Sequence, residues 1–147
     1  MNNYILKILD YDSKYNDIGL ALLRVVSGLL MFFNHGLGKI SSGTDRWNRL
    51  GHALTDIIGL EFLSVFFGFM ASFAESICAL FIVLGFLTRP SSFLLLFTMV
   101  VASLHHIIDG DFSELALIYA LISLVIMING SGKYSIDKYL FDRINKT

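Results

Sequence analysis

Residues 62–86, FLSVFFGFMASFAESICALFIVLGF, decide the fold, because Glu75 is the only charged side chain in this long apolar stretch. About 20 apolar residues are enough for a helix to cross the roughly 30 Å of hydrocarbon in a bilayer. Apolar and polar residues do not alternate with a period of two, which is the pattern of a barrel strand. The stretch therefore predicts a membrane-spanning helix.

Three further apolar stretches of similar length lie on either side of it, at about Ile18–Gly38, Pro90–Ile108 and Glu114–Asn129. The connections at residues 87–89 and 109–113 are short, and short connections make consecutive helices antiparallel neighbours. We expect an all-α polytopic membrane protein whose four transmembrane helices form an antiparallel bundle. The membrane domain would span residues 18–140, between an N-terminal segment (1–17) and a C-terminal tail (141–147).

The first loop, Lys39–Glu61, is the longest and contains its own periodic pattern. Its apolar residues are spaced by three, four, three and one, which places them on one helical face: Trp47, Leu50, Leu54, Ile57 and Ile58. A helix with one apolar face and a tryptophan suits the membrane interface. We expect a short interfacial helix here, with an irregular loop as the alternative.

Charge and cysteine content exclude several classes of protein. The formal net charge is -1 and there is no basic patch, so nucleic acid is not an expected partner. The single cysteine, Cys78, can form neither an internal disulfide nor a C-x-x-C pair nor a cysteine zinc site. No intrinsic cofactor or metal site is predicted, and redox chemistry would need a bound cofactor or a partner protein. The N-terminus lacks a signal-peptide pattern, so the first apolar segment should be retained.

The positions of lysine and arginine predict the orientation in the membrane. With the N-terminus in the cytoplasm, seven basic residues lie on that side and three on the other. The positive-inside rule then favours both termini in the cytoplasm. The acidic segment around Asp109 and Asp111 would lie outside.

Arg24 and Glu75 are the two deeply placed ionisable residues. Each lies on a helical stripe of small residues, which allows helices to approach closely in lipid. A charge near the bilayer centre costs several kcal/mol and is a functional-site hypothesis by default. We expect Arg24 and Glu75 to form a buried ion pair, with either a structural role or a direct role in ligand or proton handling.

A second group of ionisable residues is expected near the outer ends of the helices: His35, His105, His106, Asp109 and Glu114, with Lys39 at the end of the first helix. Histidine titrates near neutral pH, so histidine beside a carboxylate can exchange protons with a lipid-soluble redox carrier. We predict that His35, His105 or His106, and Glu114 line a pocket for a quinone head group or a similar amphiphile. The alternatives are a transition-metal site, axial haem ligation, and interfacial histidines that only hydrogen-bond their neighbours.

The sequence resembles the DoxX family over roughly residues 18–140. The run Phe33–Lys39 is similar to the family's HGxxK signature, and Trp47, Gly51 and Gly59 match its first loop. Glu75 followed by Leu84–Arg89 resembles its second helix. The remaining matching segments are Thr98–Ala102 before His105-His106, Glu114–Leu117, and Gly130–Asp137.

The sequence departs from the family pattern in two segments. Gly130-Ser131-Gly132 replaces the usual Gly-Pro-Gly, and Ser76 and Cys78 replace the usual glycines after the glutamate of the second helix. The resemblance implies a bacterial inner-membrane protein of four helices. It also implies a relation to the small subunit of thiosulfate:quinone oxidoreductase and to membrane complexes of the oxidative-stress response.

Three functions are compatible with these observations. The chain would be a subunit of a quinone-linked oxidoreductase, with the lipid bilayer, a quinone and a partner subunit as its partners. Alternatively, it would be a non-catalytic membrane anchor or assembly subunit of a larger complex. A transporter is disfavoured, because the sequence contains neither an internal repeat nor a pair of broken helices.

Overall fold

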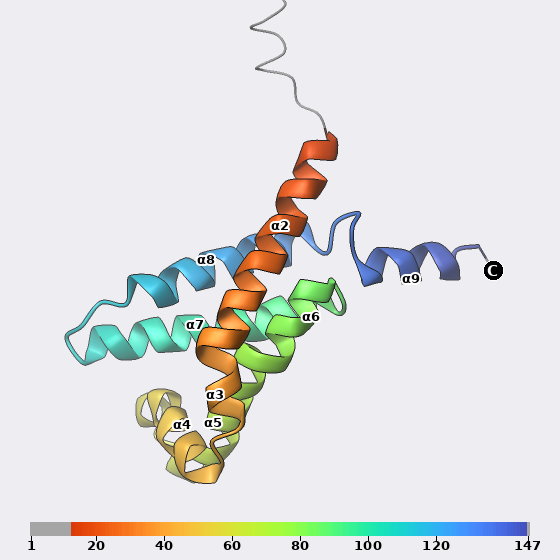
Figure 1. Cartoon of the computed structure of the whole chain (residues 1–147). Helices are drawn as coiled ribbons and strands as arrows, with labels where there is room; N and C mark the ends of the chain where they lie inside the picture. The colour runs from red at the N-terminus through yellow and green to blue at the C-terminus, as the bar shows by residue number, and fades with distance from the viewer. Residues whose placement is uncertain (1–12, 147) are drawn as a thin grey trace, which may run out of the picture.

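The computed structural model describes residues 13–146, and every regular element in this part of the chain is helical (Figure 1). The first long helix comprises α2 (Ser13–Met31), the π-helical turn η1 (Phe32–Gly36) and α3 (Leu37–Ile40). The second comprises the 3₁₀ turn η2 (Glu61–Leu63), α5 (Ser64–Phe73), the π-helical turn η3 (Ala74–Cys78) and α6 (Ala79–Leu84). The other helices are α4 (Thr44–Ile58), α7 (Thr88–Ile108), α8 (Glu114–Asn129) and α9 (Ile136–Ile144).

Within residues 13–146, three helices are long and apolar enough to cross a membrane: Tyr15–Ile40, Glu61–Leu84 and Thr88–Ile108. They correspond to three of the four predicted spans. The fourth, α8, forms where the sequence predicts it but has only 16 residues, about 24 Å at 1.5 Å per residue. The uncharged run continues to Gly132, but the helix ends at Asn129, as the fourth apolar stretch does, because Gly130 adopts a positive φ of 77°.

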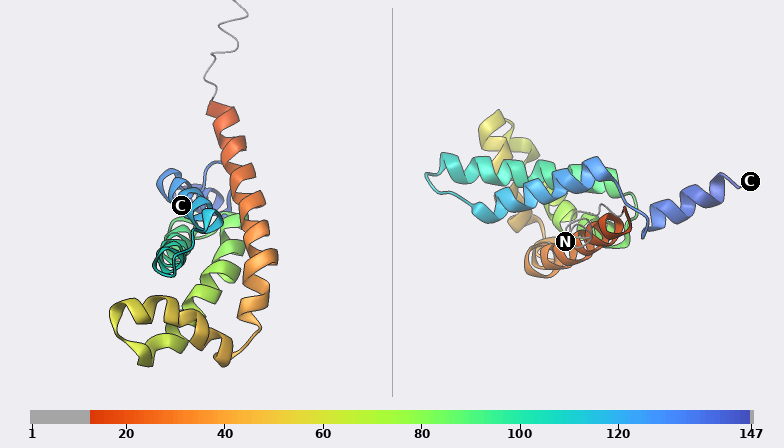
Figure 2. Two further views of the ribbon diagram at one scale, coloured as in Figure 1. Left: turned by 90° about the vertical axis from the view of Figure 1, so that its left-hand side faces the viewer. Right: turned by 90° about the horizontal axis from the view of Figure 1, so that it is seen from above.

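The four apolar helices do not all run parallel. The α2 and α6 helices lie side by side, whereas the α7–α8 hairpin crosses α2 at a steep angle and is seen nearly end-on when α2 stands upright (Figure 2). A hydrophobic core forms where α2, α6, α7 and α8 meet. Its buried residues are Met31, Ala79, Ile82, Leu95, Met99, Tyr119, Ala120 and Ile126.

Glycines allow the helices to approach closely. A Cβ on Gly28 of α2 would lie 2.6 Å from the Val83 side chain and 2.9 Å from the Ala79 carbonyl oxygen of α6. Small residues at helix contacts serve this purpose in lipid, where apolar burial against another helix gains little over burial in lipid. Of the residues predicted on the two stripes, Arg24, Met31, Ser72, Glu75 and Ala79 are buried, whereas Gly38 is exposed.

Two shorter helices lie outside the four apolar ones, one in the first loop and one near the C-terminus. The first loop does contain a helix, α4, which packs along α5; Trp47 stacks edge-on against Phe69 at 5.0 Å between ring centroids. The α9 helix is not among the predicted elements, and it continues across the predicted start of the tail at residue 141. Ser135 caps this helix by accepting a hydrogen bond from the Lys138 backbone N–H at 3.2 Å.

Candidate functional site

Two π-helical turns bring His35 and Glu75 to one place. His35 lies in η1 of the first long helix and Glu75 in η3 of the second, and the two turns pack directly on each other. Gly36 makes this possible, because a Cβ there would clash with the Glu75 carbonyl oxygen and lie 2.7 Å from the Ser76 Cα. Single π turns inside α-helices occur frequently at functional sites. The contact between two such turns makes the region around η1 and η3 the first candidate for a functional site.

Glu75 forms an ion pair with Lys39, on the last turn of the first long helix. The Lys39 Nζ lies 2.7 Å from Oε1 and 2.6 Å from Oε2 of Glu75. The glutamate side chain is 3% exposed and the lysine side chain 22%. Trp47 fixes the end of this helix by donating its Nε1–H to the Lys39 carbonyl oxygen at 3.0 Å. The charged pair is therefore held from three elements: α3, η3 and α4.

The predicted ion pair between Arg24 and Glu75 is not formed. Arg24 is buried, but its Nη2 donates to the Tyr134 carbonyl oxygen at 2.5 Å, and a Cβ on Gly85 would collide with its Nη1. Gly85 follows Glu75 by ten residues, about 15 Å along a helix. The two side chains thus occupy different levels of the membrane domain, and Lys39 takes the place that the sequence analysis gave to Arg24.

His35 and His106 line one cavity of about 220 Å³ together with the ion pair. We call it the polar cavity; its lining residues are Met31, His35, Lys39, Glu75, Met99, Ala102, His106, Ser113, Leu115, Ala116 and Tyr119. The His35 and Tyr119 rings meet edge-on with centroids 6.1 Å apart. Two imidazoles, a phenol, an ammonium and a carboxylate therefore surround one space.

A second cavity of about 240 Å³ adjoins the first and is mostly apolar. We call it the apolar cavity; it is lined by α4, α5 and α7 through Leu50, Gly51, Ala53, Leu54, Phe66, Phe67, Met70, Ala71, Leu94, Phe97, Thr98 and Val101. Lys39, Glu75 and Ala102 line both cavities. The ion pair thus lies where the polar and apolar cavities meet.

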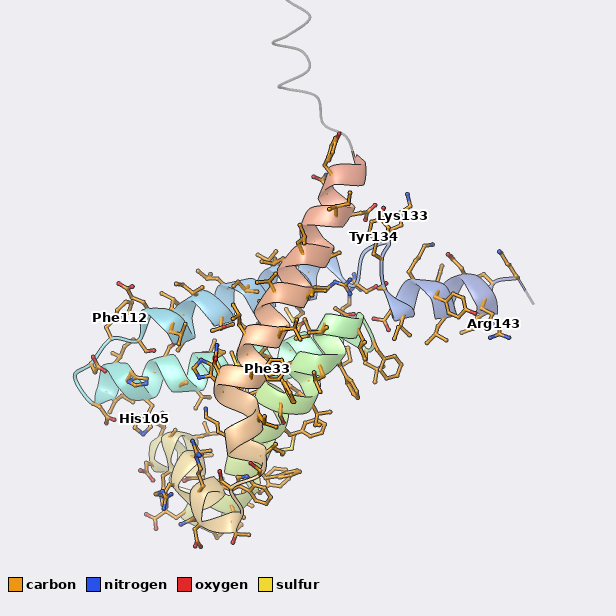
Figure 3. All side chains as sticks on the ribbon, viewed as in Figure 1. Phe33, His105, Phe112, Lys133, Tyr134 and Arg143 are labelled. Atoms are coloured by element: carbon orange, nitrogen blue, oxygen red, sulfur yellow. The ribbon has the colours of Figure 1, made fainter. Side chains whose placement is uncertain are left out.

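His105 and Glu114, two further predicted site residues, lie outside the polar cavity. His105 is near the end of α7 that is farthest from the turn containing Lys133 and Tyr134 (Figure 3), and its Nδ1 lies 2.8 Å from Asp109 Oδ2. Glu114 begins α8 and is exposed, whereas its neighbours Ser113 and Leu115 face the cavity. Of the two adjacent histidines, only His106 lines the polar cavity.

The site also contains residues that the sequence analysis did not assign to it. Tyr119 was not singled out, and Lys39 was assigned only to the end of the first helix. The spacing Met31, His35, Lys39, with four residues at each step, is a signal that could have identified the lysine. Within residues 13–146, no group of three or more histidine, cysteine or acidic side chains is arranged to hold a metal ion.

The comparison with protein families gives one match. A family model described as DoxX matches residues 19–107, which is more than half of the chain and includes His35, Lys39, Glu75 and His106. No curated protein and no solved structure matches the chain.

Proposed function

Because this chain belongs to the DoxX family of membrane proteins, we propose that it is a small subunit of a quinone-linked redox system. The quinone ring would bind in the polar cavity and the isoprenoid tail in the apolar cavity. One observation carries the proposal: a cavity with hydrogen-bonding groups and an apolar cavity adjoin at the Lys39–Glu75 pair.

The cavity volumes favour a ligand that occupies both spaces. Sites for small molecules usually measure about 300–1,000 Å³, and they are mostly apolar with a few convergent polar groups. Each cavity alone, at about 220 and 240 Å³, is below that range, whereas the two joined reach it. A polar ring with an apolar chain matches this division better than a compact solute.

The polar groups suit a quinone carbonyl, which only accepts hydrogen bonds. Lysine, tyrosine and a histidine N–H can donate to it. His106 Nδ1 lies 3.4 Å from Asp111 Oδ2, which leaves Nε2 as the ring nitrogen available to a ligand. A titratable histidine next to the carbonyl could also exchange the protons that accompany quinone reduction.

The position in the membrane is part of the same proposal. The seven-to-three distribution of lysine and arginine favours both termini in the cytoplasm of a bacterial inner membrane. In that orientation the ends of α3 and α7 face outward, and the polar cavity opens toward the outer leaflet. The α8 helix would be the fourth span, and α4 would lie at the outer interface.

Titration of the detergent-purified full chain with a short-chain quinone tests this function. The single tryptophan, Trp47, is hydrogen-bonded to Lys39 beside both cavities, so quenching of its fluorescence should report binding. His106→Asn should weaken binding about tenfold, because a hydrogen bond to a polar ligand is lost. His105→Asn is the matched control and should bind as the wild type does, since His105 does not line the cavity.

Absence of quinone binding to the wild type, or equal binding by wild type and His106→Asn, would contradict the proposal. The alternative, a non-catalytic anchor or assembly subunit, would then be preferred. For that function the Lys39–Glu75 pair would only stabilise the contact between the two π turns.

A further inference from the structure

A third cavity, of about 520 Å³, lies at the opposite end of the α7–α8 hairpin from the histidines. Five segments converge on it: α2 with Asp17, the first turn of α7 with Arg89, the end of α8, the turn 130–133, and α9 with Lys138. Figure 3 shows this turn, marked by Lys133 and Tyr134, far from His105. The cavity is therefore separate from the site proposed for the quinone.

Three cations line this cavity, and two of them have no acceptor within residues 13–146. The guanidinium of Arg89 and the ammonium of Lys133 make no hydrogen bond or ion pair in that part of the chain, whereas Lys138 pairs with Asp142 at 2.6 Å. Arg89 is also in the first turn of α7, where the helix dipole disfavours a cation. The Arg89 and Lys133 side chains are both exposed, so they are free to contact an anion that enters the cavity.

The two carboxylates that line the cavity are already hydrogen-bonded by the protein. Asp137 accepts from the backbone N–H groups of Leu87 and Thr88 at 2.8 and 2.9 Å and from the Thr88 hydroxyl at 2.8 Å. Asp17 accepts from the Lys133 N–H at 3.3 Å. Neither carboxylate pairs with Arg89 or with the Lys133 ammonium group.

The turn between α8 and α9 adds backbone donors. The N–H groups of Ser131 and Gly132 have no acceptor among residues 13–146, and both residues line the cavity. Gly130 and Gly132 have φ angles of 77° and 68°, which glycine adopts without strain. Consecutive free N–H groups in such a turn form a concave site for anions.

We propose that this cavity binds the phosphate group of an anionic phospholipid. Arginine presents a planar fork of donors that matches phosphate, and lysine adds a point charge. The cavity lies at the ends of the apolar helices α2, α7 and α8, with Phe141 in its lining and Leu87 and Tyr134 exposed nearby. Basic pockets between membrane helices at the cytoplasmic surface are typical sites for anionic headgroups.

The test compares three probes on the detergent-purified full chain: phosphatidylglycerol, phosphatidylcholine and inorganic phosphate. Native mass spectrometry measures retained lipid, and thermal unfolding measures stabilisation by each probe. Phosphatidylglycerol should bind more tightly than phosphatidylcholine, whose choline compensates the phosphate charge. Replacing Arg89 and Lys133 together with glutamine should weaken phosphatidylglycerol binding by about tenfold for each cation removed.

Arg49→Gln is the control for the loss of a positive charge elsewhere, because Arg49 is exposed on α4 at the other end of the protein; it removes one charge, and the double variant removes two. Equal retention of phosphatidylglycerol by wild type and the Arg89→Gln/Lys133→Gln variant would overturn the proposal, as would an equal loss in Arg49→Gln. Stabilisation by inorganic phosphate alone, lost in the double variant, would support the phosphate site but overturn its assignment to a lipid. None of these results affects the quinone titration, which probes the other end of the hairpin.

Discussion

Breaking the Lys39–Glu75 pair from either side should have unequal effects on stability. The Glu75 side chain is 3% exposed, and the Lys39 side chain is 22% exposed. Lys39→Met keeps the length of the side chain but leaves a buried carboxyl group without its cation. Breaking a buried pair in this way costs about 3–5 kcal/mol. Glu75→Gln leaves an ammonium group that can reach water along its flexible stem, so we expect a loss of about 1–2 kcal/mol.

Thermal unfolding of the detergent-purified protein measures the difference. One kcal/mol shifts the midpoint by about 2–4 °C in a domain of roughly this size. Lys39→Met should therefore unfold about 10 °C below the wild type, and Glu75→Gln about 4 °C below it. Lys146→Met is the control, because Lys146 is exposed beyond α9 and the substitution is the same.

The double variant tests whether the two side chains interact in solution. Residues in direct contact show coupling energies of about 0.5–3 kcal/mol. Lys39→Met/Glu75→Gln should accordingly lose less stability than the two single variants added together. Additive losses would refute the pair, and a larger loss for Glu75→Gln than for Lys39→Met would refute the argument from burial.

Three further predictions concern the parts that hold the site in place. Gly36→Ala should lower stability by about 1–3 kcal/mol, because the added Cβ would meet the Glu75 backbone. Gly19→Ala is the control and should not destabilise the protein, because a Cβ there would meet open space. Thermal unfolding compares the two variants. Asp137→Asn should lower stability by about 1–2 kcal/mol, because the Asp137 carboxylate caps α7 by accepting hydrogen bonds from the Leu87 and Thr88 N–H groups. Asp142→Asn, which breaks only the exposed pair with Lys138, should lower it by less than about 1 kcal/mol. Thermal unfolding measures both. Fusion reporters at the C-terminus and near Gly110 should report opposite sides of the membrane.

Each of these predictions has a contradicting result. Equal thermal-unfolding midpoints for Gly36→Ala and Gly19→Ala would mean that the two π turns can move apart with no loss of stability. A larger effect of Asp142→Asn than of Asp137→Asn would mean that the cap contributes little. Reporters that place the C-terminus outside would overturn the proposed orientation.

The membrane helices could be predicted because hydropathy is a property of each segment alone. The long run around Glu75 and the run at 90–108 specify apolar helices whatever their neighbours are. The bounds of α8 agree with the fourth predicted stretch, Glu114–Asn129, and the helix stops where Gly130 adopts a positive φ. The α9 helix does have a sequence signal, because Ser135 is a suitable N-cap and apolar residues recur at 136, 140 and 144.

The partner of Glu75 could not be predicted because it depends on how far one helix slides along another. The helical period shows which face a residue occupies, and Arg24 and Lys39 both face inward. They differ in level by 15 residues, about 22 Å along the helix axis. Hydropathy does not fix that level, since any sliding keeps the apolar faces in contact. For the same reason, the sequence predicts a cavity that contains His35 and His106, but it does not exclude Glu114 from that cavity.

The π turn at Phe32–Gly36 means that the number of residues in this segment matters as much as their identity. In a regular α-helix, steps of four residues advance by about 40° beyond a full turn, so Met31, His35 and Lys39 would drift around the axis. A wider turn holds more residues and offsets this drift, and all three side chains line the polar cavity. Deleting one residue between 32 and 36 would restore the regular α-helical repeat and at the same time rotate Lys39 away from Glu75. After such a deletion the chain would still enter the membrane and fold. Its charged groups would no longer face each other across the two helices.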